Sequence, residues 1–134
     1  MSDGTAFVLD ASALLALFHC EKGGDEIDRI ISREDATVYM SAINYAEVLS
    51  KAVAHGKNPE IIIAAIRTLD IHVMAFDAAL AELAGVLKPQ AAPWGLSLGD
   101  CACLVLAKHL EATAVTADTA WANLGNAFRM MFIR

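Results

Sequence analysis

Short apolar runs alternate along this chain with longer segments of helical periodicity. The runs are almost continuously apolar, which is typical of strands that are buried on both faces of a sheet. We expect strands at 5–9, 37–40, 71–75, 113–115 and 128–133. We expect helices at 11–18, 25–31, 44–54, 59–69, 78–87, 99–110 and 119–124. This alternation predicts an α/β fold in which a parallel sheet is covered by helices on both faces.

Local signals mark several of these boundaries. Gly56 stands just past the end of a helix, where glycine is favoured. Asn58 and Pro59 are suited to cap the next helix and to occupy its first turn, and Asp77 is suited to cap the one after it. We expect residues 88–95, with two prolines, to form a loop.

The chain has the size and composition of a single domain that spans residues 1–134. Apolar residues make up 57% of the sequence and charged residues 19%, which is enough to bury a core and leave apolar surface for a partner. The formal net charge of −6 argues against binding nucleic acid through bulk positive potential. It leaves open a nuclease whose metal ions cancel charge locally.

The sequence does not predict a membrane or secreted protein. The apolar run at 7–18 is interrupted by Asp10 and Ser12 and is too short to span a bilayer, and no basic residue precedes it as in a signal peptide. We therefore expect a cytoplasmic protein. The cysteines form no CxxC pair and the histidines no ligand motif, so we interpret the former as small buried residues and the latter as surface or helix-end residues.

Four acids stand out by position. Asp10, Asp100 and Asp118 each follow an apolar stretch where a helix begins, and Glu47 lies on an expected helix between them. The carboxyl ends of parallel strands line the ligand crevice of such sheets, so these acids can converge. Converging carboxylates repel one another, and a divalent cation relieves that repulsion. Carboxylate oxygens favour Mg²⁺ or Mn²⁺, which can activate water against a phosphodiester.

Each acid also has a purely structural interpretation. The alternatives are helix capping by Asp10 and Asp118, capping boxes at Ser97/Asp100 and Asn44/Glu47, and an ion pair of Glu47 with Lys51. Capping does not explain why Ser12 and Thr116 each stand two residues from an acid. Hydroxyls at that spacing can hydrogen-bond a carboxylate and orient it, although they can also bond within their own turn.

The motifs resemble those of the PIN domain, and within it the VapC-type toxins of bacterial toxin–antitoxin pairs. The resemblance lies in VLDASALLAL, SAINYAEVLSKA, LSLGDCACLVLA and TAVTADTAW, in this order over nearly the whole chain. It implies a three-layer α/β/α sandwich around a central, mostly parallel sheet of four or five strands. It further implies a cytoplasmic Mg²⁺- or Mn²⁺-dependent endoribonuclease that leaves a 5′-phosphate and a 3′-hydroxyl.

By position, the resemblance makes Asp10, Glu47, Asp100 and Asp118 the catalytic and metal-binding quartet. Ser12, Thr116 and Asn44 match the supporting polar positions. The implied partners are an RNA substrate, a cognate antitoxin and a second copy of the chain as a homodimer. The apolar segment 61–66 is either an antitoxin surface or a core helix. The basic residues, among them Lys51, form no obvious RNA track in the sequence.

Two alternative functions belong to other classes. One is an aspartate-based phosphatase or phosphotransfer domain, which would favour a lysine near the acids and, in one large group, an acid rather than Ser at position 12. The other is a non-catalytic PIN-like binding module, against which the presence of all four acids argues.

Overall fold

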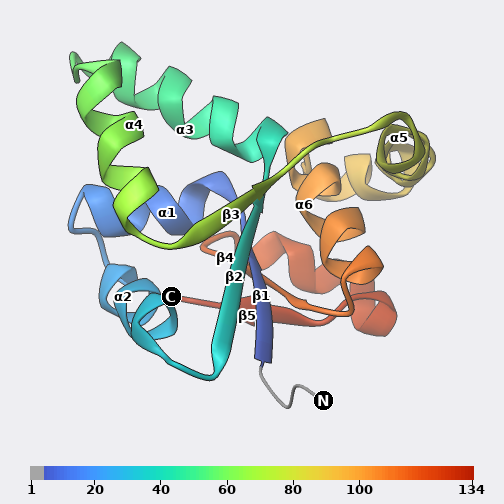
Figure 1. Ribbon diagram of the computed structural model, residues 1–134. Coiled ribbons are helices and arrows are strands. Elements are labelled where there is room, and N and C mark those ends of the chain that lie inside the picture. Colours follow the sequence, from blue (N-terminus) through green and yellow to red (C-terminus); the bar gives the residue numbers. More distant parts are fainter. Residues whose placement is uncertain (1–4) are drawn as a thin grey trace.

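A computed structural model describes residues 5–134 and shows a five-stranded parallel sheet between two layers of helices (Figure 1). The strands are β1 (Thr5–Leu9), β2 (Ala36–Ser41), β3 (Ile71–Met74), β4 (Thr113–Thr116) and β5 (Met130–Phe132). The α-helices are α1 (Ala11–Phe18), α2 (Gly24–Ser32), α3 (Ala42–Ala54), α4 (Pro59–Thr68), α5 (Ala78–Ala91) and α6 (Leu98–His109). Two 3₁₀ segments, η1 (Ala92–Trp94) and η2 (Thr119–Ala127), complete the fold.

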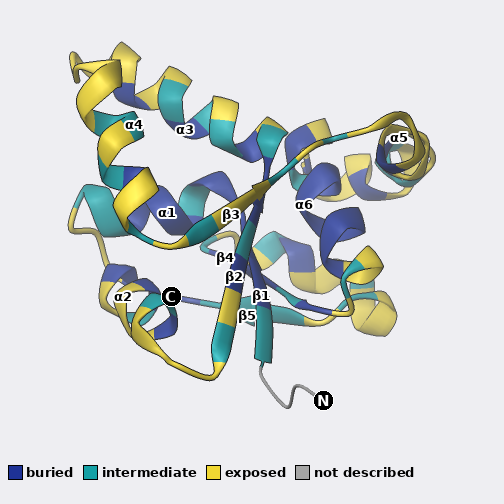
Figure 2. Ribbon diagram, viewed as in Figure 1, coloured by how far each residue is buried: buried dark blue, intermediate teal, exposed yellow. Residues whose placement is uncertain are grey.

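The strand order is β3-β2-β1-β4-β5, and each adjacent pair is parallel. Successive residues of β1 point to opposite faces of the sheet: Phe7 and Leu9 pack into one core and Val8 into the other. Helices α1 to α4 cover the first face, and α5, α6 and η2 cover the second (Figures 1 and 2). The predicted α/β/α sandwich is therefore confirmed, with five strands in its sheet.

Helix capping follows the predicted signals in most places. Asp10 accepts a hydrogen bond from the backbone N–H of Ala13, and Asp77 accepts one from Leu80. The Asn58 side chain accepts from Glu60, with Pro59 in the first turn of α4, and Gly56 has a φ of 80° just past α3. These local devices explain why sequence and structure agree at these boundaries.

Several predicted boundaries were wrong. Helix α3 begins at Ala42, two residues before the expected start, because Ser41 provides the N-cap. Helix α5 continues through Pro89 to Ala91, so most of the expected loop is helical. Pro89 has no N–H to donate to the carbonyl of Gly85, and the helix ends two residues later. The expected last helix is 3₁₀, and the last strand is shorter than predicted.

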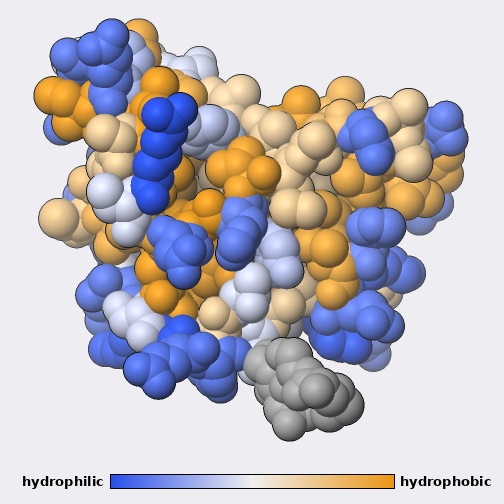
Figure 3. All heavy atoms as spheres, viewed as in Figure 1, coloured by the Kyte–Doolittle hydropathy of each residue, from blue (hydrophilic) through white to orange (hydrophobic). Residues whose placement is uncertain are grey.

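Apolar residues reach the surface over α4 and α5 (Figure 3). In the expected all-apolar segment of α4 only Ile66 is buried, and Ile61 is 66% exposed. On α5, Val86 is 71% exposed. Helix α4 is therefore not the deeply packed core helix that one interpretation required. In the described part of the chain, no helix has the length and apolar character needed to cross a membrane.

Candidate metal centre

The candidate site lies where the chain leaves the two central strands. Strands β1 and β4 are neighbours in the sheet, and the connections from β1 and β4 diverge there. This position is a switch point of the strand order, where open α/β sheets bind ligands outside their strand carboxyl ends. Asp10 directly follows β1, and Asp118 comes two residues after β4.

Asp10 is the buried centre of this site, with 3% of its surface exposed. Its Oδ1 accepts hydrogen bonds from the Ser12 hydroxyl at 2.8 Å and the Ala13 N–H at 2.8 Å. Its Oδ2 accepts one from the Thr116 hydroxyl at 2.6 Å. Burial raises the pKa of Asp10 to about 6, although these hydrogen bonds act in the opposite direction. The carboxylate is held in one orientation at an energetic cost.

The two hydroxyls beside Asp10 also tie together the ends of β1 and β4. The Ser12 Oγ accepts a hydrogen bond from the Ala117 N–H at 3.0 Å, and the Thr116 Oγ1 accepts one from the Asp118 N–H at 3.0 Å. Thr116 is fully buried. Both hydroxyls therefore make the carboxylate contact that their spacing allowed, and Thr116 links Asp10 to the backbone of Asp118.

Asp100 and Asp118 make local capping contacts as well. Asp100 and Ser97 form a complete capping box at the start of α6, with bonds of 2.8 and 3.1 Å. Asp118 accepts a hydrogen bond from the Ala120 N–H at 3.0 Å. Burial raises the pKa of Asp100, with a further contribution from the charge of Asp118 and an opposing one from Lys51. The capping interpretation of both acids is therefore correct, and it does not exclude a role in metal binding.

Glu47 is placed by a contact between α3 and α6. The Asn44 Nδ2 donates to the Glu47 Oε1 at 2.8 Å and to the Gly99 carbonyl at 3.0 Å. Asn44 is fully buried and lies inside α3, so it forms no capping box with Glu47. No ion pair joins Glu47 to Lys51 within residues 5–134.

Gly99 has a role that the sequence did not reveal. A Cβ on Gly99 would lie 2.6 Å from the Glu47 Oε1 and 2.7 Å from its Oε2. Only glycine therefore lets this carboxylate lie against the first turn of α6, next to Asp100. In the sequence, the only indication was that Gly99 immediately precedes an acid. The reason for a glycine there is visible only in the packing of α3 against α6.

We expect Gly99→Ala to lower metal-dependent activity by about tenfold to a hundredfold, the range for groups that support a metal site. The added methyl group pushes away the flexible end of Glu47, so the fold should persist. The matched control is Gly85→Ala, because a Cβ on Gly85 meets no atom within 4 Å. Activity and thermal melting of both variants test this, and full activity in Gly99→Ala would show that the placement of Glu47 is unimportant.

The four acids share one electrostatic neighbourhood. The charge of Asp100 raises the pKa of Asp10, and that of Asp118 raises the pKa of Asp100. The buried Cys103 thiol has its pKa raised by burial and by the charges of Asp10, Asp100 and Glu47. Even so, no three Asp, Glu, His or Cys side chains within residues 5–134 are grouped closely enough to hold a metal ion. Each carboxylate instead makes the local hydrogen bonds described above.

These residues suit a hard divalent cation in their chemistry. They offer carboxylate oxygens whose mutual repulsion a cation would relieve. The Oδ1 of Asn44 is buried without a hydrogen-bond partner among the described residues, so it is available as a neutral oxygen acceptor at the same place. The metal-binding role of Asp10, Glu47, Asp100 and Asp118 stays a prediction.

The fold is that of an α/β protein whose parallel sheet lies between two layers of helices, with acids at the switch point as a candidate ligand site. The model of the PIN domain family matches residues 7–127, so the chain belongs to the PIN domain family. Comparison with curated proteins gave no match.

Solved structures share this fold at low sequence identity. Mycobacterium tuberculosis VapC20, described as a toxin that cleaves the sarcin-ricin loop, matches with a TM-score of 0.74 and 18% identity, over 89% of this chain and 95% of that one. VapBC2 from Rickettsia felis, bound to a promoter DNA fragment, matches with a TM-score of 0.71 and 17% identity, over 96% and 98%. VapBC-1 from nontypeable Haemophilus influenzae has a TM-score of 0.71 and 18% identity over the same shares. The predicted resemblance to VapC toxins is thus confirmed at the level of fold.

Proposed function

We propose that this protein is a divalent-metal-dependent endoribonuclease and the toxin of a toxin–antitoxin pair. The observation that carries the proposal is the buried Asp10 carboxylate, oriented by two hydroxyls and electrostatically coupled to Asp100 at the switch point of a PIN fold. Buried carboxylates with such raised pKa values cluster at functional sites. The cleavage described for VapC20 supports RNA as the substrate class.

Each acid has a distinct part in this proposal. Asp10, Asp100 and Asp118 would hold Mg²⁺ or Mn²⁺, and Glu47 would complete the site, directly or through water. The bound ion would supply a water of lowered pKa and would stabilise charge on the phosphodiester. Ser12 and Thr116 keep the Asp10 carboxylate in one orientation, and Asn44 does the same for Glu47. Such positioning is what lets an ion and a phosphate meet in a reactive geometry.

We propose an antitoxin as the protein partner and a homodimer as the assembly. Several structures of similar fold are described as toxin–antitoxin complexes, including one from Klebsiella pneumoniae. The exposed apolar residues of α4 and α5 supply surface that a helical partner or a second copy would bury.

Purified protein should cut RNA with Mn²⁺ or Mg²⁺ and not with EDTA, and should leave 5′-phosphates on the fragments. The inactive variant is Asp100→Asn, because asparagine can still accept the Ser97 N–H bond and preserve the cap. The matched control is Asp77→Asn, the same change at the N-cap of α5, and it should keep full activity. Equal metal-dependent cleavage by wild type and Asp100→Asn would contradict the proposed site. No cleavage of any RNA tested with either ion would favour the non-catalytic binding module.

A further inference from the structure

A small pocket lies beside the acidic site, between α1, α3 and the last residue of the chain. Its volume is about 250 Å³, and its polar lining consists of Ser12, His19, Glu21, Lys51, His55 and Arg134. Helix α1 packs against α3, which brings together residues that are far apart in the sequence (Figure 1). The structure therefore gathers basic residues that formed no track in the sequence.

The basic groups around this pocket come from separate elements. Lys51 lies on α3, and its charge lowers the pKa of Asp100, so it is close to the acids. The Arg134 Nη1 donates to the Lys22 carbonyl at 2.8 Å and lies 3.6 Å from the Glu21 carboxylate. The hydrogen bond to the Lys22 carbonyl holds the Arg134 guanidinium beside the pocket, whereas the Glu21 carboxylate partly neutralises its charge. Among the described residues that line this pocket, Glu21 has the only acidic side chain.

The two histidines sit at the ends of neighbouring helices. His19 follows α1 and His55 follows α3, and their ring centroids are 5.7 Å apart. The Nδ1 of His55 lies 2.8 Å from the Lys51 carbonyl. A carbonyl can only accept, so Nδ1 carries the proton, and the backbone of Lys51 orients the ring. The pocket thus has two cations and two imidazoles, of which that of His55 is oriented by a hydrogen bond, on a protein of net charge −6.

Ser12 connects this pocket to the candidate metal centre. Its hydroxyl lines the pocket and also donates to both oxygens of Asp10, at 2.8 and 2.9 Å. A nucleic-acid strand with one phosphate in the pocket would therefore extend from the pocket to the neighbouring acids. Phosphate contacts by basic side chains dominate the affinity of proteins for nucleic acid and fix its register. The acids themselves repel a phosphate, so a nearby cationic contact is needed to hold the strand.

We propose that this pocket binds a backbone phosphate of the RNA substrate next to the phosphodiester that is cut, with Lys51 and Arg134 as the main contacts. The proposal rests on the proposed ribonuclease function. The basic and polar side chains that line the pocket suit a phosphate group. Glu21 weakens the attraction by partly neutralising Arg134.

The test uses fluorescence anisotropy to measure the binding of a short, 5′-labelled single-stranded RNA in EDTA at several salt concentrations. EDTA removes cleavage and metal from the measurement. We expect Lys51→Gln and Arg134→Gln each to weaken binding about three- to tenfold and to reduce the slope of log K against log salt by about 0.7. The matched controls are Lys57→Gln and Arg67→Gln, exposed residues outside this pocket, which should bind like wild type.

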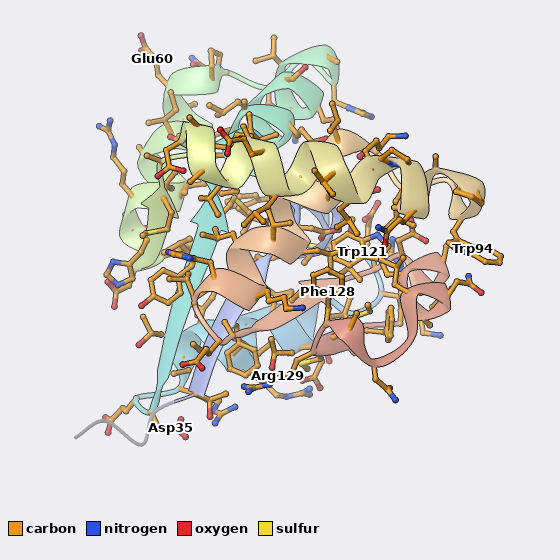
Figure 4. The ribbon with its side chains drawn as sticks, turned by 90° about the vertical axis from the view of Figure 1, so that its right-hand side faces the viewer. Asp35, Glu60, Trp94, Trp121, Phe128 and Arg129 are labelled. Atoms are coloured by element: carbon orange, nitrogen blue, oxygen red, sulfur yellow. The ribbon has the colours of Figure 1, made fainter. Side chains whose placement is uncertain are left out.

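Glu21→Gln provides a test in the opposite direction. Removing this charge frees Arg134 from its carboxylate partner, so RNA binding should become about threefold tighter. A loss of structure cannot produce tighter binding, so this readout separates phosphate binding from folding effects. The control is Glu60→Gln, an exposed acid in the first turn of α4 that does not line the pocket. Figure 4 shows the Glu60 side chain pointing away from the molecule.

The outcomes separate this inference from the ribonuclease proposal. If pocket variants bind RNA like wild type while the wild type still cuts RNA, the phosphate site is wrong and the nuclease stands. If pocket variants lose RNA binding while no metal supports cleavage, the phosphate site stands and the nuclease fails. Unchanged RNA binding with weakened binding of an acidic antitoxin peptide would reassign the pocket to the antitoxin and overturn our proposal.

Discussion

Asp10→Asn should lower the rate of metal-dependent RNA cleavage by about three orders of magnitude or more. The same change should stabilise the metal-free protein at neutral pH. The loss of activity follows because the central carboxylate of the site is replaced by a neutral amide. The gain in stability follows because the carboxylate is buried, with its pKa raised to about 6. Function and stability therefore change in opposite directions.

The pH range of this effect follows from the shifted pKa of Asp10. An unfolded chain releases the proton near its ordinary pKa of 3.8, whereas the folded protein keeps it until about 6. Between these values the folded state binds more protons, so the free energy of unfolding falls as pH rises. Above pH 6 the ionised carboxylate costs about 3 kcal/mol, because each pKa unit corresponds to about 1.4 kcal/mol. At about pH 4 this cost is nearly absent.

Urea denaturation of wild type and Asp10→Asn in EDTA, at about pH 4.5 and 7.5, measures this difference. The variant should be more stable by up to about 3 kcal/mol at the higher pH, and the gap should shrink at the lower one. Thr116→Val offers a second check, because losing the hydroxyl bond to Oδ2 should raise the pKa of Asp10 further. A gap that does not depend on pH would show that Asp10 ionises without cost in the folded protein.

Mn²⁺ should raise the melting temperature of wild type and leave that of Asp100→Asn nearly unchanged. A ligand that binds only the folded state stabilises it by about 2.7 kcal/mol at a hundredfold excess over its Kd. For a domain of this size we expect a shift of about 10 °C. Binding would also relieve the repulsion that raises the pKa of Asp100 beside Asp118.

The control for this measurement is again Asp77→Asn, which changes an N-cap away from the candidate site and should respond to Mn²⁺ like wild type. Ca²⁺ at the same ionic strength separates a general charge effect from a site that prefers smaller ions. If Mn²⁺ shifts neither wild type nor variant, the four acids are caps and surface charges, and the metal-dependent function loses its basis.

Much of the scaffold followed from short-range patterns in the sequence. Continuous apolar runs predict buried parallel strands, and the caps at Asp10, Asn58 and Asp77 predict helix starts. These signals act within a few residues, so they can be interpreted without knowing the fold. The boundary errors arose at Ser41, which caps α3 ahead of the expected start, and at Pro89, which lies inside α5 instead of ending it.

The four acids and two hydroxyls could be chosen from the sequence because they stand at strand ends or in motifs that resemble those of a known family. The hydrogen bond between Asn44 and Gly99, across 55 positions, could not be predicted. It depends on how α3 packs against α6, and no local pattern specifies that distance. The exposure of Ile61 was equally undecided, because an apolar helix can face either a core or a partner.

Signals between neighbouring positions predict the strands, most helix starts and the candidate acids. The sequence alone was therefore sufficient to predict these features. The tertiary structure decided which groups meet: the hydroxyls of Ser12 and Thr116 on one carboxylate, Gly99 against Glu47, and Lys51 and Arg134 around one pocket. The physical reason is that side-chain contacts between distant segments depend on helix packing and on a parallel sheet that brings strand ends together.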